Sequence, residues 1–324
     1  MGEKKMTSIG GQAVIEGVMM RGPHKTAVAV RKPDGEIIID EKETKGIGKW
    51  AKVPIIRGVV SFISSMVIGV QALMFSAKFF DVEEDEKTKK EKVGAGPVSA
   101  RAKEKNNSKK EQNKEENIPE WMLYISVLLA VGMSIGLFIV LPNIISNVFV
   151  INREQNPVIY NLVESIVKLI IFLGYIILVS QMKDIKRTFE YHGAEHKTIF
   201  CYENGEELTP ENVKKYSRFH PRCGTSFLLF VVIISIIVFS LVGVYKNPFI
   251  NMGLRLLLLP LVAGISYEII KFAGKSKNKC DTWLNAPGKW LQKFTTREPD
   301  EKQIEVAIAA LKAVIPENKD DDKW

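Results

Sequence analysis

The side chains best suited to chemistry are concentrated in one stretch of this chain, residues 191–227. Three of the four histidines and two of the three cysteines lie there. His192, Glu195 and His196 form a His-x-x-Glu-His pattern. If the segment is helical, these three side chains share one face, because positions i, i+3 and i+4 are neighbours on a helix. The pattern matches the inverted zincin signature, in which two histidines bind a metal beside a catalytic glutamate.

A second pair of potential ligands follows in the sequence His-Pro-Arg-Cys, at His220 and Cys223. Imidazole and thiolate are common ligands of zinc and related divalent metals. We therefore predict a divalent metal site, with zinc as the first candidate and iron as the alternative. The candidate ligands are His192, His196, His220 and Cys223. Four protein ligands would close a structural site, whereas two histidines with only one of His220 and Cys223 would leave a position open for catalysis by Glu195. Histidines that only cap a helix or form structural hydrogen bonds are the alternative.

The composition indicates a membrane protein. Apolar residues make up 46% of the 324 residues and are gathered into long blocks separated by charged segments. The net charge of +8 fits a basic face beside anionic lipid headgroups. We expect no nucleic-acid partner, because basic and aromatic residues do not form a compact stripe. Three widely spaced cysteines do not form a disulfide framework. The N-terminus lacks the apolar run of a signal peptide.

The predicted fold is mainly α, a polytopic helical membrane protein with a small N-terminal β-hairpin module. The less apolar segment 58–80 is predicted to be a re-entrant or interfacial helix pair. Lysine and arginine are concentrated in the His/Cys loop 183–225 and near both termini, which the positive-inside rule assigns to the cytoplasm. Two cytoplasmic termini require an even number of membrane crossings. Four strongly apolar spans meet this requirement, at 121–141, 158–182, 226–245 and 251–272, and form a predicted membrane bundle at 121–272.

Polar segments flank this bundle. Residues 1–57 are predicted to form a glycine-rich module with a hairpin of strands 26–31 and 36–41 around the turn sequence Lys-Pro-Asp-Gly. Gln12, Glu16 and Arg21 of this module could cover a site below it. Residues 81–120 are predicted to be a disordered charged linker. The tail 273–324 contains an amphipathic helix after Pro299, with apolar side chains at helical spacing at Ile304, Ile308, Leu311 and Ile315.

Five charged residues fall within the predicted spans, at Glu164, Lys168, Arg255, Glu268 and Lys271. Glu164 and Lys168 are four positions apart and are expected to pair. Glu268 lies at the cytoplasmic end of its span, where it could act as a metal ligand or a catalytic acid. A salt bridge between Glu268 and Lys271 or Arg187 is the alternative. Arg187, Arg218 and Arg222 could hold an anionic substrate or a lipid phosphate.

Four segments in this order resemble the YqhQ-like family of bacterial membrane proteins. They are GGQAVIEGVMMRGP at 10–23, YHGAEHKTIFCYE at 191–203, RFHPRCGTSF at 218–227 and LQKFTTREPDEKQIEVAIAAL at 291–311. The resemblance implies a multi-pass protein of the bacterial cytoplasmic membrane. Members of this family are domains of unknown function that have been predicted to be metal-dependent enzymes. The resemblance implies no particular substrate.

Together, these features predict a membrane protein with a divalent-metal site at the cytoplasmic face. We expect a hydrolase acting on a peptide or a lipid-linked substrate, with Glu195 and Glu268 as catalytic residues. A non-enzymatic scaffold or regulatory protein, stapled by a structural His/Cys site, is the main alternative. A transporter that uses the intramembrane charges is the second. The sequence points to no protein partner.

Overall fold

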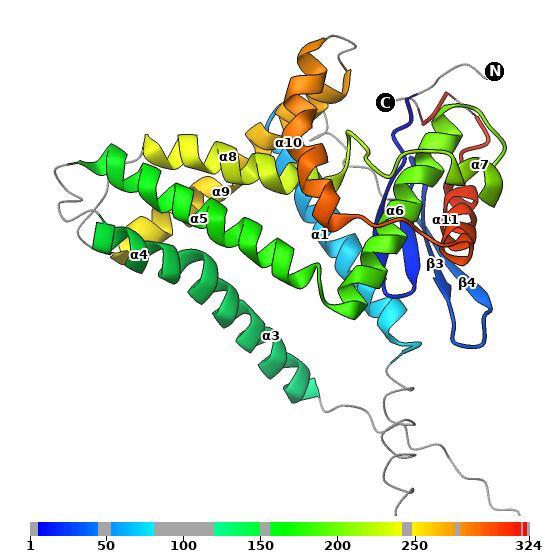
Figure 1. Ribbon diagram of the computed structural model, residues 1–324, viewed down its shortest axis with the longest axis horizontal. Helices are drawn as coiled ribbons and strands as arrows, with labels where there is room; N and C mark the ends of the chain where they lie inside the picture. The colour runs from blue at the N-terminus through cyan, green and yellow to red at the C-terminus, as the bar shows by residue number, and fades with distance from the viewer. Residues whose placement is uncertain are drawn as a thin grey trace, which may run out of the picture.

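The computed structural model describes residues 6–44, 53–80, 120–149, 156–241, 248–275, 279–318 and 320–322 (Figure 1). The chain is mainly helical, with one small antiparallel sheet near its N-terminus. The sheet and its helices lie at one end of the molecule, and long apolar helices extend from it (Figure 1). The predicted charged linker, except for Glu120, lies outside the described residues.

The sheet contains four strands in sequence order: β1 (Gly10–Val14), β2 (Gly17–Arg21), β3 (Lys25–Arg31) and β4 (Ile37–Glu43). The predicted hairpin is confirmed as β3–β4. Its turn is closed by the Gly35 N–H, which donates to the Lys32 carbonyl at 2.9 Å. Gly35 has a φ of 91°, which glycine adopts without steric cost. The glycine-rich stretch forms a second hairpin, β1–β2, which the sequence analysis did not assign to strands.

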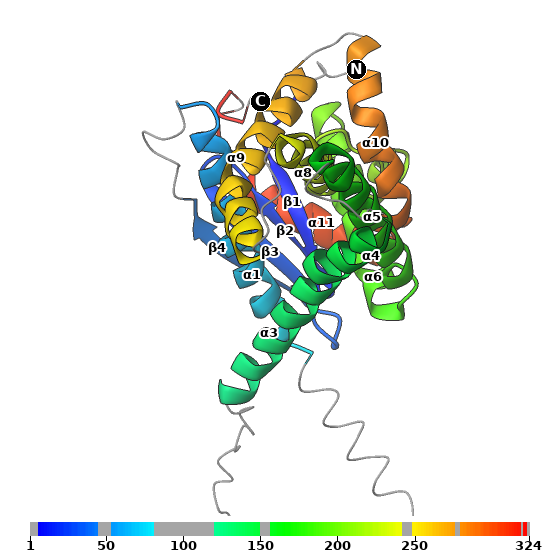
Figure 2. The same ribbon diagram turned by 90° about the vertical axis from the view of Figure 1, so that its left-hand side faces the viewer.

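Helices cover both faces of the sheet (Figure 2). One face, which includes Val18, Met20 and Ala29, packs against α6 (Lys183–Glu203) and α11 (Glu301–Val314). The other face packs against α1 (Ile56–Ala77), and the side chains buried there are those of Val14, Met19, Val28, Val30 and Ala72. Because successive side chains of a strand point to opposite faces, both faces of the central strands must be apolar. This explains why β2 is apolar from Gly17 to Met20.

The predicted helix pair at 58–80 is wrong, because α1 is one uninterrupted helix. It is long and apolar enough to cross a membrane. The first half of α1 packs against α9 (Pro248–Lys275), where Gly58 meets Gly264 and Tyr267, and Phe62 meets Phe227 of α8 (Gly224–Ser240). The long helix α5 (Pro157–Val179) lies in the same set of apolar helices (Figure 1). The second half of α1 packs on the sheet. The outer face of α1 remains apolar and exposed, as at Ile63 and Val70.

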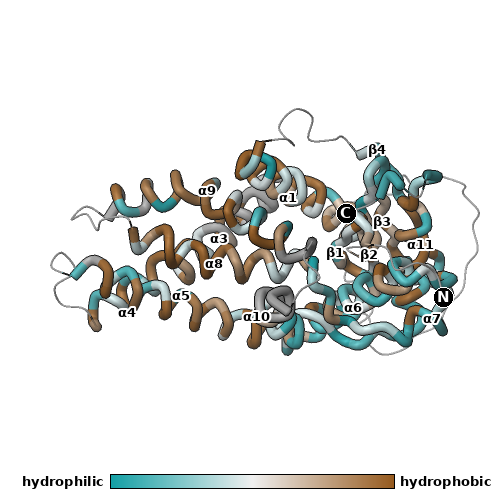
Figure 3. Tube along the Cα trace, turned by 90° about the horizontal axis from the view of Figure 1, so that it is seen from above, coloured by the Kyte–Doolittle hydropathy of each residue, from teal (hydrophilic) through white to brown (hydrophobic). Residues whose placement is uncertain are grey.

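Four helical stretches are long and apolar enough to span a bilayer: α1, residues 128–149, α5 and α9. The stretch 128–149 joins the end of α3 (Glu120–Ile135) to η2 (Gly136–Val140) and α4 (Leu141–Phe149). The predicted span 226–245 is shorter than expected. In the described residues α8 has 17 residues, about 26 Å at the helical rise, against about 30 Å for a hydrocarbon core. Figure 3 shows that apolar residues dominate these helices, whereas polar residues gather around the sheet.

The C-terminal segment returns to the sheet through α10 (Lys279–Thr295). The predicted amphipathic helix is confirmed as α11, which buries Ile304, Ile308 and Leu311. Its N-terminus is closed by a capping box in which Asp300 and Gln303 bond to each other's backbone N–H groups. The segment before β1 also contacts the segment after α11, because the Ser8 N–H donates to the Asp322 carbonyl at 2.5 Å.

The buried Glu164 of α5 does pair with Lys168, as expected, with 2.9 Å between Lys168 Nζ and Glu164 Oε1. Its second partner comes from another helix. Both terminal nitrogens of Arg255, in α9, bond to the Glu164 carboxylate, one of them at 2.6 Å. The sequence pattern could not reveal this pair, because the two residues are far apart in the chain.

Candidate metal centre

Helix α6 brings three of the predicted site residues onto one face. His192, Glu195 and His196 project from successive turns, as the i, i+3, i+4 spacing predicts. The helix is held close to the C-terminal segment at Gly193, where a Cβ atom would collide with the Arg297 carbonyl oxygen. The site is thereby built against the chain that connects α10 to α11.

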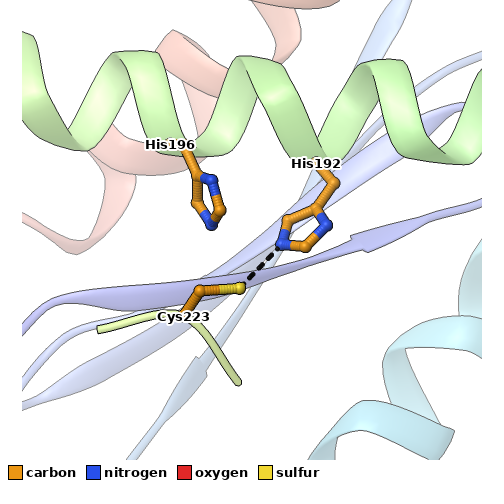
Figure 4. A group of neighbouring side chains, drawn as sticks. All are labelled: His192, His196 and Cys223. Carbon is orange, nitrogen blue, oxygen red and sulfur yellow. Dashed lines mark hydrogen bonds between the residues drawn. The ribbon is translucent and has the colours of Figure 1, made fainter. Parts of the chain in front are cut away.

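The two histidines converge with Cys223 (Figure 4). The His192 Nε2 lies 3.2 Å from the Cys223 Sγ. One ligand atom from each of His192, His196 and Cys223 lies within 4.8 Å of the other two. The three side chains are almost entirely enclosed by protein. This arrangement has the donor set and the proximity that a divalent metal of the zinc class requires.

Main-chain carbonyl groups fix the orientation of both imidazole rings. The His192 Nδ1 lies 2.8 Å from the Thr295 carbonyl oxygen, and the His196 Nδ1 lies 2.5 Å from the Arg218 carbonyl oxygen. A carbonyl can only accept, so each Nδ1 must carry the proton. In a neutral ring the lone pair then resides on Nε2, which faces the cluster. The buried His196 Nε2 has no hydrogen-bond partner in the described structure.

Cys223 occupies the N-cap of α8, where its Sγ accepts from the Thr225 N–H at 3.4 Å. Burial alone would raise the pKa of the Cys223 thiol, but the neighbouring His192 and His196 outweigh burial and hold this pKa well below its usual range. Burial alone would lower the pKa of His192, but the Cys223 thiolate and the Glu195 carboxylate raise this pKa to about 9. The short contact between His192 and Cys223 thus couples the protonation of the imidazole to that of the thiol.

Glu195 is buried beside the cluster. Its Oε2 lies 3.4 Å from the His196 Nε2 and 3.8 Å from the His192 Nε2. Burial raises the pKa of Glu195, although both histidines and a hydrogen bond from the Gly11 backbone oppose this effect. Gly11 permits the contact, because a Cβ there would lie 2.8 Å from the Glu195 Cγ. The carboxylate is thus close enough to exchange a proton with a group bound at the cluster.

His220 lies next to the cluster but does not join it. Its Nε2 lies 3.7 Å from the Glu203 Oε2, and its Nδ1 accepts from the Arg222 N–H at 3.3 Å. Burial lowers the pKa of His220 to about 4. Gln292 clamps the backbone of His220, since its amide both accepts from the His220 N–H and donates to the His220 carbonyl, each at 2.8 Å. The group of close potential ligand atoms in the described residues contains His192, His196 and Cys223. The His220 ring lies beside it, 5.6 Å from the His196 ring between centroids, and its buried Nε2 also has no hydrogen-bond partner among the described residues.

Glu268, in α9, pairs with Arg57 of α1 and not with the His–His–Cys cluster. Its carboxylate pairs with both sides of the Arg57 guanidinium, with 2.7 Å between Arg57 Nε and Glu268 Oε1. It also accepts from the Ile55 N–H at 3.3 Å. These contacts fasten the start of α1 to α9. Glu268 therefore forms a salt bridge with Arg57, which the sequence did not predict, whereas Arg187 pairs with Glu16 and Lys271 adds a positive charge nearby. The structure does not bring Glu268 together with His192 and Cys223.

The three arginines predicted to hold an anion, Arg187, Arg218 and Arg222, all bond to other groups of the protein. Arg187 bonds to Glu16 in the β1–β2 turn, and the Tyr191 hydroxyl donates to the same carboxylate at 3.2 Å. Arg222 pairs with Glu203, and Arg218 donates to the Thr296 carbonyl at 2.8 Å. Of the three residues predicted to cover the site, Glu16 contacts α6. Gln12 instead packs on Gly69 of α1, and Arg21 lies near Tyr267 of α9.

Sequence reasoning missed the groups that orient the histidines. The Thr295 and Arg218 carbonyls belong to the backbone, and no residue type announces them. Gln292 was detectable only as part of the segment 291–311. The described structure thus has a small sheet module that carries a His–His–Cys cluster at the end of a set of membrane-capable helices.

Comparison with known proteins identifies the family of this chain. Residues 53–317 match a family described as "Protein of unknown function (DUF1385)", and this chain belongs to that family. It is also 34% identical to the uncharacterized protein YqhQ of Bacillus subtilis (strain 168), over 94% of this chain and 92% of that protein. No solved structure matches the chain.

Proposed function

We propose that this protein is a metal-dependent hydrolase of the bacterial cytoplasmic membrane, with its site facing the cytoplasm at the membrane surface. The substrate would be a peptide or a lipid-linked molecule. The four membrane-capable helices and the polar module at one end of them support the location. The concentration of lysine and arginine in the segments on the module side supports the orientation.

One observation carries the proposal of a metal. The Nδ1 atoms of His192 and His196 both donate to main-chain carbonyls, so their Nε2 atoms are directed toward Cys223. Outer hydrogen bonds of this kind fix the tautomer and the orientation of histidines that bind metals. The buried His196 Nε2, which has no hydrogen-bond partner among the described residues, is the kind of orphaned atom that a metal would satisfy.

The residues define how such a site would work. Three protein ligands would leave one coordination position open, as in catalytic zinc sites. A zinc ion bound there would supply Lewis-acid activation of a water molecule and of the substrate. Glu195 is placed to accept the proton of the attacking water and to return it to the leaving group. The buried position of Glu195 protects this proton transfer from bulk solvent.

Metal analysis tests the proposal. The full chain would be purified in detergent without a His-tag and its metal content measured by elemental analysis. We expect about one zinc or iron per chain in the wild type and in Glu195→Gln. His192→Ala, His196→Ala and Cys223→Ala should lose the metal. Hydrolysis of a peptide or lipid-linked substrate should be lost in Glu195→Gln while its metal remains. Wild-type protein that binds no metal after careful reconstitution would disprove the proposal.

The same experiment distinguishes the non-enzymatic scaffold. If the cluster were only a structural staple, replacing any ligand would lower metal content and thermal stability together. Glu195→Gln would then change neither property nor any cellular function of the protein. In a catalytic site, by contrast, Glu195→Gln separates metal binding from activity.

A second candidate function is supported by the 3.2 Å contact between His192 and Cys223. A thiolate paired with an imidazolium at a helix N-terminus can attack an acyl group as a nucleophile. Cys223→Asp discriminates between the two functions. An aspartate can bind a metal and would retain part of a metal-dependent activity, whereas it cannot replace a thiolate that forms a covalent intermediate.

A further inference from the structure

Strand β1 forms an edge of the described sheet, beside the candidate metal centre. Gly10 and Gly11 are exposed to solvent although they lie next to the buried Glu195. No atom lies within 4 Å of the position that a Cβ on Gly10 would occupy. Two glycines thus leave the strand backbone accessible at the point where it meets the site.

The register of β1 shows which backbone groups face outward. Val14 and Gly17 pair across a two-residue turn, so hydrogen-bonded pairs alternate from that point with pairs that have no hydrogen bonds. The N–H and C=O groups of Gly11 and Ala13 therefore point away from β2. The next residue in this alternation behaves in the same way: the Ile15 N–H also points away from β2 and donates to the Ser76 Oγ at 3.3 Å.

Side chains already hold most of the outward N–H groups. Thr7 accepts from the Ile9 N–H at 3.1 Å, and Glu195 accepts from the Gly11 backbone. In the part of the chain that the structure describes, the outward N–H of Ala13 has no such acceptor. Ala13 N–H, Ala13 C=O and Gly11 C=O form a short row of main-chain groups with the spacing of an extended chain.

We infer that the free edge of β1 binds an extended peptide as an additional strand and delivers one of its amide bonds to Glu195 and the His–His–Cys cluster. This inference rests on the proposed hydrolase function and selects a peptide over a lipid-linked substrate. Peptide main chains bind sheet edges through regularly spaced N–H and C=O groups. An acyl chain carries no such groups. The Gly11 N–H marks the position of the reacting amide, because Glu195 contacts it directly.

The test compares small metal-binding probes on zinc-loaded wild-type protein. Acetohydroxamate reports on the metal alone, a tripeptide hydroxamate on the metal plus the strand edge, and octanoyl hydroxamate on the metal plus an alkyl chain. We expect the tripeptide probe to bind at least about tenfold tighter than acetohydroxamate, since each main-chain hydrogen bond adds about two- to tenfold in affinity. N-methylation of its amides should remove this gain.

A pair of variants localises the effect to β1. Ala13→Pro removes the outward N–H, and proline is tolerated on edge strands where the N–H is not needed for pairing. We expect Ala13→Pro to weaken the tripeptide probe about five- to tenfold and to leave acetohydroxamate unchanged. Ala13→Ser keeps the N–H and should bind both probes like the wild type.

Three outcomes would overturn the inference. The edge would not bind peptide if Ala13→Pro bound the tripeptide probe as well as Ala13→Ser. An octanoyl probe that equalled the tripeptide probe would favour a lipid chain. Both of these outcomes leave the metal site standing, because acetohydroxamate still binds. If acetohydroxamate does not bind the wild type at all, the proposed hydrolase fails together with the inference.

Discussion

Two buried polar clusters in this protein are built differently. Among the apolar helices, the Glu164 carboxylate is paired with both Arg255 and Lys168. Beside the sheet, the two histidines of the α6 cluster are fastened through Nδ1, but the buried His196 Nε2 has no hydrogen-bond partner in the described structure. The carboxylate of the first cluster is fully paired, whereas the second cluster leaves a buried ring nitrogen unpaired among the described residues.

The difference separates structural from functional polar groups. Buried polar groups in folded proteins are almost always paired, so a fully paired cluster needs no role beyond holding helices together. A buried cluster that is rigidly oriented and incompletely paired is the better candidate for binding. The following predictions use this comparison, beginning with the largest expected effect.

Disrupting the cluster of Glu164, Arg255 and Lys168 should lower the free energy of unfolding and leave metal binding at the His–His–Cys cluster unchanged. Glu164→Leu leaves Arg255 and Lys168 without their carboxylate, and we expect a loss of about 3–5 kcal/mol in the free energy of unfolding. Denaturant or thermal unfolding in detergent measures this loss. Replacing both cations by methionine in the same variant should restore most of the stability. A Glu164→Leu protein as stable as the wild type, or one that has lost metal binding, would contradict the comparison.

Removing a candidate metal ligand should instead lower the affinity for zinc. We expect His196→Ala to lower zinc affinity by more than about a hundredfold, because even outer-shell substitutions cost about 10- to 100-fold. His220→Ala is the matched control, since it removes a neighbouring buried histidine that lies outside the ligand group. Competition with a fluorescent zinc chelator measures both. Equal losses in the two variants would return His220 to the ligand set.

The two exposed glycines of β1 provide a finer test of packing at the site. Gly11→Ala places a methyl group 2.8 Å from the Glu195 Cγ and 2.7 Å from the Met19 carbonyl oxygen. Overpacking of this kind costs about 1–3 kcal/mol. Gly10→Ala enters open space and should be neutral or slightly stabilising. Thermal unfolding of the pair checks this expectation, which fails if the two variants unfold alike.

The smallest effect concerns helix ends. Asp300 caps α11 through a capping box, so Asp300→Ala should destabilise the protein by about 1 kcal/mol. Asn156 precedes α5 and makes no side-chain capping bond. We therefore expect Asn156→Ala to have little effect in the same unfolding measurement. A larger effect at Asn156 would show that membrane-capable helices depend on caps as much as those of the module do.

Local patterns in the sequence were sufficient for several parts of the fold. The hairpin β3–β4 followed from a turn sequence between alternating runs, and α11 followed from apolar residues at helical spacing. The common face of His192, Glu195 and His196 required only the geometry of one helix. In each case the interactions that define the element lie within a few residues of one another.

Features that depend on distant contacts could not be predicted. Glu268 was expected at the metal site because of its level in the predicted bundle, but Arg57 lies closer and carries the opposite charge. Spacing alone could not decide between His220 and Cys223. The arrangement of these residues depends on distant contacts such as those of Gln292, which bonds to the backbone of His220. The packing of the second half of α1 on the sheet likewise depends on contacts between distant parts of the chain.

The path of the chain has a consequence for biosynthesis. The strands of the sheet are synthesised well before α11, which covers one of the faces of the sheet. The backbone carbonyl that orients His192 also belongs to a segment made after the apolar helices, at Thr295. The sheet can therefore be covered on both faces only after the intervening apolar helices have been synthesised. A nascent chain that stalls before α11 would leave one face of the sheet open.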